Sequence, residues 1–573
     1  MVAAKKADFN AIGEQLHIDP VIVRIMRNRE MTTADEMRAF LSKDARLLHA
    51  PEYLPDMDKA VKILKAKIAE HKSLRIIGDY DVDGVTSVCI LYKGLKALGA
   101  EVSYAIPDRV TDGYGINTAM INRAKEDGID TVITCDNGIA ATDAVNLAKE
   151  YGITCIVTDH HEVPYTEQDG VRTYVYPNAD AIIDPKIPDC GYPNPGICGA
   201  MVAYKLITAL GCEDELDKEL KELAGLATVC DVMELTDENR AVVAYTLKSM
   251  ENSPNTGIKA LRRVCDTENK PVNTHELGFI IGPCLNATGR LDSADRSVEL
   301  LLSDDLNDAI LKATELKNLN ELRKGYTEEG EKAAIEYIEE NAMAKDKILI
   351  VYLPSLHESL AGIVAGRIKE KYYRPTLVFT DSENGIKGSG RSIESYNMYD
   401  GLSRCKDLYD KFGGHAMAAG LSMPKENFDE FKKRLLDECA LTDEDLIKKI
   451  IIDVPMPLSY VTEELIDQLS LLEPYGTGNP KPLFADKGLK IISAKEMGKT
   501  GDMCRLSATD ATGRKYELVM FKGYKDLIDS VMKATGEPSP VGMSIDIIYT
   551  PGINEFRGFK NLQFTVLEFR LPL

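Results

Sequence analysis

The stretch Asp79-Tyr80-Asp81-Val82-Asp83-Gly84 places three carboxylates within five residues, directly after the apolar run Leu74 to Gly78. Short β-branched runs that end in a Gly or Asp turn are typical of buried strands. In α/β folds, ligands bind at the carboxyl ends of the strands, and clustered carboxylates suit Mg²⁺, Mn²⁺ or Ca²⁺. The stretch therefore predicts a metal site at the end of a strand.

A calcium-binding EF-hand loop begins with the same DxDxDG pattern. Such a loop needs a preceding helix and a bidentate Glu at its twelfth position. Counted from Asp79, that position is Ile90, and the preceding residues are typical of a strand. Both observations argue against the EF-hand.

Length and composition limit the class of protein. The chain has 573 residues, 44% hydrophobic and 28% charged, which is enough for about three or four globular domains. No stretch reaches the ~18 apolar residues of a membrane helix, and Met1 to Asp8 lack the core of a signal peptide. We therefore expect a cytoplasmic protein without a membrane partner. The 12 cysteines include no CxxC pair, which favours a reducing compartment over a zinc ribbon.

The net charge of −22 argues against a polyanionic partner, but the charge is unevenly distributed. From Lys448 to the end the chain carries 16 basic and 16 acidic residues, so the acidic excess lies upstream. A nucleic acid could still bind the C-terminal part and local basic clusters, with divalent metals neutralising the acidic site.

Strands and helices alternate after the acidic stretch. Expected strands cover Glu101 to Ile106, Thr131 to Cys135 and Ile153 to Thr158, and expected helices cover Val85 to Leu98 and Asp143 to Tyr151. Repeated βα units imply a mainly parallel sheet with helices on both faces. The carboxyl ends of its strands share one edge, where the following side chains should converge: Asp79, Asp81, Asp83, Asp136, Asp159, His160 and His161. Each Asp taken alone is more often a turn former or helix cap, but together they predict a dinuclear centre for phosphoryl transfer.

Two later features add candidates. A helix over Lys218 to Val229 ends in Cys230-Asp231, and Asp231 is a further possible ligand. The polar stretch Asn286 to Asp292 contains Gly289 and Arg290 and is expected to be a loop, either a phosphate contact or merely a turn.

The remaining pattern predicts the domain organisation. We expect a helical segment (1–50), a catalytic domain (51–303), a connecting helix (304–345) broken near Gly325 and Gly330, a smaller α/β domain (346–445) and a β-barrel (446–573).

Two Gly-rich loops, residues 388–392 and 412–416, carry Arg391 and His415 and are expected to clamp a phosphate chain. The candidates for binding a single-stranded nucleic acid on the barrel are Tyr549, Phe556, Arg557, Phe559 and Lys560. The alternative is that the aromatic residues among them form the core of the barrel.

The motifs DYDVDG, CDNG, TDHH, NATGRLD, GSGRS and FGGHAMAAG, in this order and together with Asp231, resemble the DHH phosphoesterase superfamily. More narrowly, they resemble its exonucleases that degrade single-stranded DNA from the 5′ end. The resemblance covers residues 50 to 570 and implies a parallel-sheet DHH domain, a long helix, a smaller α/β DHHA1 domain and a C-terminal OB-fold barrel. It implies release of 5′-mononucleotides by two-metal hydrolysis in DNA repair and recombination. The alternatives are a phosphodiesterase for short oligonucleotides or cyclic dinucleotides, a pyrophosphatase, and a non-catalytic DNA-binding relative.

The resemblance also assigns roles to residues. It implies two Mn²⁺ or Mg²⁺ ions, bridged by Asp136 and held by Asp81, Asp83, Asp136, His160 and Asp231. It places His161 on the scissile phosphate and Asp159 in support of it, and it leaves Asp79 either as a metal ligand or as a residue that supports the ligands. The implied substrate contacts are Arg109, Arg290, Ser389, Arg391 and His415. Single-stranded DNA is the implied partner, with a single-strand-binding protein and a helicase as further candidates. Cys284 departs from the pattern, because a basic residue is more usual there.

Overall fold

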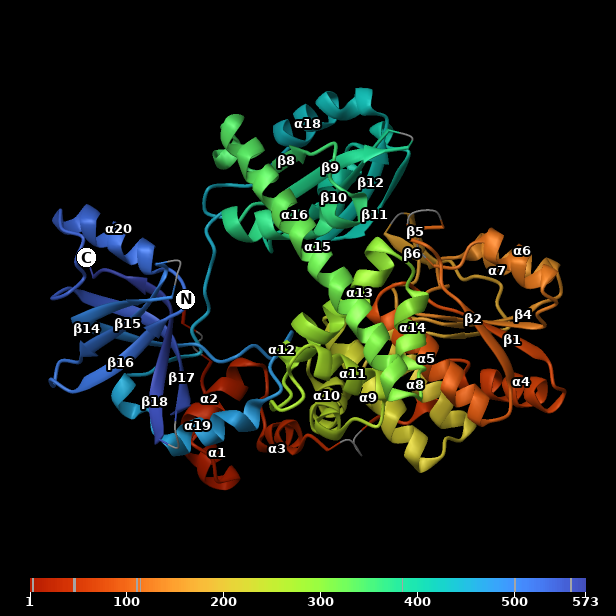
Figure 1. The fold of residues 1–573 in the computed structure, drawn as a ribbon, viewed down its shortest axis with the longest axis horizontal. Helices are drawn as coiled ribbons and strands as arrows, with labels where there is room; N and C mark the ends of the chain where they lie inside the picture. Colours follow the sequence, from red (N-terminus) through yellow and green to blue (C-terminus); the bar gives the residue numbers. More distant parts are fainter. Residues whose placement is uncertain are drawn as a thin grey trace. The chain divides into compact units, whose positions relative to one another are not determined.

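The computed structural model describes residues 1–2, 5–44, 48–109, 112–113, 115–168, 170–383, 385–498, 501–556 and 559–572 (Figure 1). The chain divides into two compact units. The large unit comprises residues 45–233 and 241–448, and the barrel unit comprises residues 1–44, 234–240 and 449–573. Residues 234–240 thus belong to the barrel unit, although the residues on both sides of them in the chain belong to the large unit.

A five-stranded parallel sheet forms the first part of the large unit. Its order is β2 (Glu101–Ala105), β1 (Ser73–Ile77), β3 (Thr131–Cys135), β4 (Thr154–Thr158) and β7 (Ala181–Ile183). Every pairing is parallel, and β3 is buried at each residue, as in a sheet covered on both faces. Helices α6 (Thr118–Glu126) and α7 (Thr142–Glu150) share a hydrophobic core with it. The predicted parallel α/β architecture is confirmed.

Helices α5 (Val82–Ala97), α8 (Gly199–Leu210), α9 (Asp214–Cys230), α11 (Thr256–Val264) and α13 (Gly282–Leu291) complete this part. The prediction of a loop over Asn286 to Asp292 was wrong, because α13 runs through to Leu291. Cys284, Leu285 and Ala287 are buried, so packing outweighs the turn propensity of the polar residues. A Cβ at Gly289 would lie 2.4 Å from the Tyr80 carbonyl oxygen, so this glycine permits close packing rather than a turn.

The connecting helix α15 (Leu306–Glu340) is continuous over 35 residues, so the predicted break was also wrong. Gly330 is buried, and a Cβ there would lie 2.8 Å from Leu356, which explains the glycine by close approach of a neighbouring segment. Packing of this kind offsets the ~1 kcal/mol that a helical glycine costs. Within the part of the chain that the structure describes, no helix is both long and apolar enough to cross a membrane.

The smaller α/β domain has a mixed sheet in the order β11 (Lys411–His415), β12 (Ala418–Met423), β10 (Gly385–Arg391), β9 (Thr376–Ser382) and β8 (Leu349–Tyr352). Helices α16 (Glu358–Tyr372) and α18 (Phe428–Asp437) lie with it. The two Gly-rich segments, predicted as loops, are largely the strands β10 and β11. A Cβ at Gly388 would lie 2.5 Å from the Phe379 ring, so this glycine makes room for an aromatic neighbour on the adjacent strand.

The barrel unit contains the strands β14 (Phe484–Met497), β15 (Met503–Thr509), β16 (Lys515–Met520), β17 (Ser544–Phe556) and β18 (Phe559–Arg570). Pairing of β14 with β17 closes the barrel, which confirms the predicted OB-type fold. Ile22 and Met26 of helix α2 (Pro20–Asn28) share its hydrophobic core, so the N-terminal segment packs with the C-terminal domain.

The structure reassigns one predicted contact of the barrel. Tyr549 is fully buried and donates a hydrogen bond to the Met456 carbonyl (2.9 Å), so it belongs to the core, as the alternative reading had it. Lys560 is exposed. Arg557 and the side chains of Phe556 and Phe559 lie outside the described residues.

Arg240 binds the segment 234–240 to the rest of the barrel unit. Its side chain is buried, and the guanidinium donates hydrogen bonds of 2.7 to 3.3 Å to backbone carbonyls of Phe40, Leu471, Leu472, Glu473 and Pro474. We expect Arg240→Met to lower the free energy of unfolding by about 3 kcal/mol, because it leaves several buried carbonyls unpaired. Urea unfolding of the full chain measures this. Arg38→Met removes an exposed pair with Asp35 and should change stability by less than ~0.5 kcal/mol, and equal losses would contradict the anchor.

Candidate metal centre

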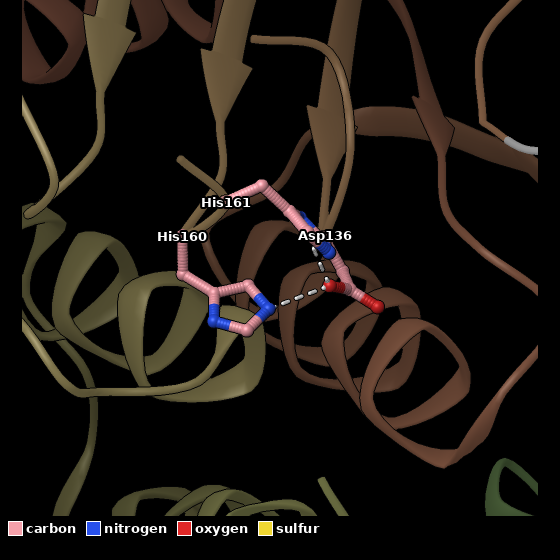
Figure 2. A group of neighbouring side chains, drawn as sticks. All are labelled: Asp136, His160 and His161. Carbon is pink, nitrogen blue, oxygen red and sulfur yellow. Dashed lines mark hydrogen bonds and ion pairs between the residues drawn. The ribbon is translucent and has the colours of Figure 1, made fainter. Parts of the chain in front are cut away.

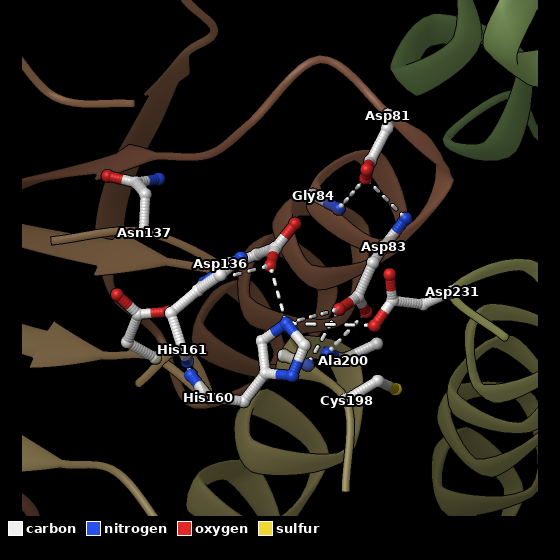
Figure 3. A network of polar contacts seen from close by, with 12 residues as sticks. Asp81, Asp83, Gly84, Asp136, Asn137, His160, His161, Cys198, Ala200 and Asp231 are labelled. Atoms are coloured by element: carbon white, nitrogen blue, oxygen red, sulfur yellow. Dashed lines mark hydrogen bonds and ion pairs between the residues drawn. The ribbon is translucent and has the colours of Figure 1, made fainter. Parts of the chain in front are cut away.

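Three parallel strands deliver polar residues to one edge of the first sheet. Asp79 follows β1, Asp136 follows β3, and Asp159, His160 and His161 follow β4. Asp231 reaches the same place from the C-terminal end of α9 (Figure 3). The structure brings these predicted residues together with Asp81 and Asp83.

The DYDVDG motif forms the turn between β1 and α5. Asp81 is the N-cap of α5, and its carboxylate accepts hydrogen bonds from the backbone amides of Asp83 (3.0 Å) and Gly84 (3.1 Å). A Cβ at Gly84 would lie 2.4 Å from the Asp79 carbonyl oxygen, so the turn requires glycine. The turn leaves Asp83 pointing into the centre (Figure 3).

Backbone amides from a distant helix fix Asp83. Its two carboxylate oxygens accept from the Gly199 amide (2.7 Å) and the Ala200 amide (2.8 Å) at the start of α8. Helix N-termini favour anions, so this contact stabilises the carboxylate form. The sequence carries no recognisable signal for this pairing, which joins residues 116 positions apart.

His160 lies at the middle of the cluster. Its Nε2 atom is 3.0 Å from Asp136, 3.5 Å from Asp83 and 3.7 Å from Asp231 (Figures 2 and 3). Three groups of side chains here could hold a metal ion: Asp136, His160 and His161; Asp83, His160 and Asp231; and Asp79, Asp81 and Asp136. Asp136 and His160 each belong to two groups, so the arrangement suits two neighbouring ions with shared ligands.

The carboxylates are held at an electrostatic cost. Burial, and then repulsion from Asp83 and Asp81, raises the pKa of Asp136, and burial followed by Asp83 raises the pKa of Asp231. Within the described residues, the buried Oδ1 atom of Asp79 has no hydrogen-bond partner. A divalent cation would reverse this balance, since it stabilises carboxylates that otherwise repel each other. The donor set of oxygens with neutral imidazole fits Mn²⁺ or Mg²⁺.

Asp159 orients His161. Its carboxylate accepts from the backbone amides of Ile139 (2.9 Å) and His160 (2.8 Å), and it lies 2.7 Å from His161 Nδ1. Burial lowers the pKa of His161, but the hydrogen bond with Asp159 and the charges of Asp159, Asp231 and Asp83 together outweigh burial and raise this pKa to about 9. His161 is therefore poised as a cation beside the centre. Burial has the larger effect on His160 and lowers its pKa, which favours the neutral ligand form.

Basic side chains gather beside the centre. Burial, and then the charges of Arg109 and Arg323, lowers the pKa of Arg290 to about 10, and burial followed by Arg109 lowers the pKa of Arg391. Arg109 stacks on the Tyr80 ring at 4.6 Å, and Arg290 donates to the Ser359 carbonyl (2.8 Å). Arginines that repel each other make a site for an anion such as phosphate.

A cavity of about 350 Å³ adjoins these arginines. Two predicted contacts, Arg109 and Ser389, line it together with Phe412 of the predicted Gly-rich segment, and so do residues that sequence reasoning missed: Glu358, Lys387 and Lys411. Lys387 and Lys411 each precede a motif that was recognised, which is the signal that could have found them. His415 is exposed at the end of β11.

The sequence matches three families of domains. These are the DHH family, N-terminal domain (residues 73–229), the DHHA1 domain (345–441) and the RecJ OB domain (452–568). The single-stranded-DNA-specific exonuclease RecJ of Bacillus subtilis is 34% identical over 97% of this chain and 69% of that protein. RecJ of Salmonella typhimurium is 33% identical over 96% of this chain and 95% of that protein. This chain belongs to the RecJ family.

Solved structures agree with membership of the RecJ family. RecJ of Thermus thermophilus in complex with Mn²⁺ matches with a TM-score of 0.81 and 26% identity, over all of this chain and 79% of that one. The same protein in complex with Mg²⁺ matches with a TM-score of 0.76 and 25% identity, over all of this chain and 78% of that one.

Gly199 of this RecJ family member leaves little room for a larger side chain beside the candidate metal ligands. A Cβ at this position would lie 2.8 Å from the Asp136 Cβ and 3.1 Å from the Asp83 carboxylate. We expect Gly199→Ala to lower phosphodiesterase activity by about 10²-fold, because displacements of ~1 Å in a reacting site have effects of this size. Gly366→Ala, where a Cβ meets nothing within 4 Å, should retain activity. Steady-state assays of both variants measure the difference, and full activity in Gly199→Ala would show that the spacing is not critical.

Proposed function

We propose that this chain is a metal-dependent exonuclease that hydrolyses single-stranded DNA from the 5′ end and releases 5′-mononucleotides. The observation that carries the proposal is the position of His160 Nε2, within 3.7 Å of carboxylates from three separate elements. Family membership supports the same reading, because the relatives are named as single-stranded-DNA-specific exonucleases.

We assign the centre to two Mn²⁺ or Mg²⁺ ions. Asp136 would be shared, and the remaining ligands would come from Asp81, Asp83, His160 and Asp231, with Asp79 beside them. Two such ions supply a nucleophile at neutral pH and stabilise charge on the attacking and leaving oxygens. The metals named with the Thermus thermophilus structures support this choice.

The chain's own residues orient the scissile phosphate. The hydrogen bond with Asp159 and the charges of Asp159, Asp231 and Asp83 outweigh burial and raise the pKa of His161 to about 9, which favours a protonated ring that can donate a hydrogen bond to a phosphate oxygen. Asp159 is held by backbone amides and therefore fixes the ring. We assign His161 to the phosphate and Asp159 to its orientation.

We assign recognition of the 5′ end to the basic residues of the smaller domain and its neighbour. After burial, the charge of Arg109 lowers the pKa of Arg290 and of Arg391, and Arg109 and Ser389 line the cavity. A terminal phosphate carries more charge than an internal one, so an arginine cluster favours a phosphorylated end. The exposed His415 is the weakest member of this set.

The barrel and the cellular role complete the proposal. OB folds bind single strands through a cationic groove and aromatic stacking, so the barrel would hold the strand beyond the site. We infer a cytoplasmic role in DNA repair and recombination, with a single-strand-binding protein and a helicase as partners. Pull-down from a lysate with the full chain and with a catalytically inactive variant would identify such partners.

Substrate preference tests the proposed function. With Mn²⁺ present, we expect long single-stranded DNA to be degraded at least ~10-fold faster than a dinucleotide, because a longer strand engages more of a binding groove. Double-stranded DNA and pyrophosphate should remain intact. Faster turnover of the dinucleotide or of pyrophosphate would contradict the exonuclease proposal and support the alternatives that act on small substrates.

A further inference from the structure

Two thiols lie against each other where helices α11 and α13 meet. Cys265 ends helix α11 and is half-buried, and Cys284 lies on helix α13 and is 2% exposed. Their sulfur atoms are 4.0 Å apart, within hydrogen-bonding distance for thiols.

The surroundings suit a reactive thiol and a partner that resolves it. The hydrogen bond from the Cys284 thiol lowers the pKa of Cys265, and the nearby charges of Lys317 and Lys324 lower this pKa further, against the effect of burial. Lys317 is held by its hydrogen bond to the Val264 carbonyl (2.7 Å), next to Cys265. A partly exposed thiol with thiolate character is the kind that oxidants reach first.

Helix α13 connects this pair to the metal centre. Asn286, two residues after Cys284, accepts a hydrogen bond from the Val82 amide (3.1 Å) in the DYDVDG turn. Farther along the same helix, Gly289 packs against the Tyr80 carbonyl and Arg290 donates to the Ser359 carbonyl (2.8 Å). A displacement of α13 therefore reaches the metal turn and the arginine cluster together.

We propose that Cys265 and Cys284 form a reversible disulfide when the protein meets a peroxide, and that this bond lowers the activity of the metal centre. Closing the bond brings the sulfurs from 4.0 Å to about 2.05 Å, so the two side chains and the ends of α11 and α13 that carry them must rearrange. Closure also removes the contact in which Asn320 donates to the Cys284 sulfur (3.6 Å). The effect on activity rests on the proposed function, whereas formation of the bond does not.

The reaction balances with one peroxide. The Cys265 thiolate attacks a peroxide oxygen, the O–O bond breaks, and the leaving hydroxide takes a proton to become water. The Cys284 sulfur then attacks the resulting sulfenic sulfur, the S–O bond breaks, and the Cys284 proton leaves with the hydroxide as a second water. The two thiols lose two electrons and two protons, and the peroxide is reduced.

The test uses the full-length protein and hydrogen peroxide, which catalase removes before the metal is added. Non-reducing mass spectrometry should find a peptide pair joined through Cys265 and Cys284, with a loss of about 2 Da. Nuclease activity should fall about tenfold and return with dithiothreitol, in keeping with the sensitivity of reacting sites to small shifts.

Matched variants make the test decisive. Cys265→Ser and Cys284→Ser should keep their activity through the peroxide step, whereas Cys212→Ser, which alters a distant half-buried cysteine, should lose activity as the natural chain does. If Cys284→Ser fails to fold, the partly exposed Cys265→Ser carries the comparison. Absence of the joined peptides, equal inhibition of Cys265→Ser, or full activity with the bond formed would each overturn the proposal. An untreated protein without nuclease activity would refute the proposed function. The mass spectrometry of the peptides would still show whether the disulfide between Cys265 and Cys284 forms.

Discussion

Asp136→Asn should reduce Mn²⁺-dependent cleavage of single-stranded DNA by at least ~10³-fold, because the shared ligand of both candidate ions is lost. The substitution keeps the shape of the side chain and removes its charge. Asp136 lies 3.0 Å from His160 and, like His160, belongs to two of the three possible metal groups, so its loss should affect both candidate ions. Initial rates with an end-labelled strand measure the effect.

Stability separates a lost ligand from a lost fold. The pKa of Asp136 is raised above its usual 3.8, so the folded protein binds a proton at this carboxyl more tightly than the unfolded chain does. The stability that this protonation contributes is fully present below pH ~4 and is lost as the pH rises through the folded pKa. At pH 8 without metal, Asp136→Asn should therefore melt no lower than the natural chain. Added Mn²⁺ should raise the melting temperature of the natural chain more than that of the variant. Asp143→Asn, an exposed change at the start of α7, should match the natural chain in both assays. Retained cleavage in Asp136→Asn would refute the metal assignment.

Arg391→Ala should reduce the use of 5′-phosphorylated ends by about 10²-fold while it weakens binding to the interior of a strand far less. Arg391 is half-buried, and its guanidinium packs against Gly362, where a Cβ would lie 2.8 Å from its nitrogen, so the side chain is held in place. A charge-assisted contact with a phosphate contributes about 1.5 to 3 kcal/mol. Arg391→Lys should recover part of the loss, because lysine keeps the charge and loses the bidentate geometry.

The comparison needs two substrates and a matched variant. Rates on strands with a 5′-phosphate and with a 5′-hydroxyl separate recognition of the end from general affinity. Arg404→Ala removes an exposed arginine of the same domain and should leave the ratio of these rates unchanged. An equal loss on both strands in Arg391→Ala would remove Arg391 from end recognition.

The metal centre was largely predictable because its residues follow apolar strands in the sequence. Asp79, Asp136 and Asp159 each follow a parallel strand by one or two residues, and parallel strands end at one edge. The central position of His160 among three carboxylates was not predictable from strand order, since it depends on side-chain directions. The amides that hold Asp83 come from residues 199 and 200, and a backbone amide leaves no mark in a sequence.

The errors share one physical cause, which is that local propensity lost to packing. Asn286 to Leu291 carries turn-forming residues, yet its apolar positions are buried and the segment is helical. Gly388 and Gly330 suggested a flexible loop and a helix break, but each makes room for a neighbouring side chain. The packing of residues 1–44 with residues 449–573 joins chain ends that local pattern cannot relate.

Degradation of one single-stranded DNA, labelled either at its 5′ end or at its 3′ end, tests the central claim most directly. The reaction should require Mn²⁺ or Mg²⁺. The account predicts that the 5′ label appears as a mononucleotide at the earliest times, while the 3′ label stays on fragments that shorten gradually. Early release of the 3′ label, or internal cuts with both labels on long fragments, would contradict it.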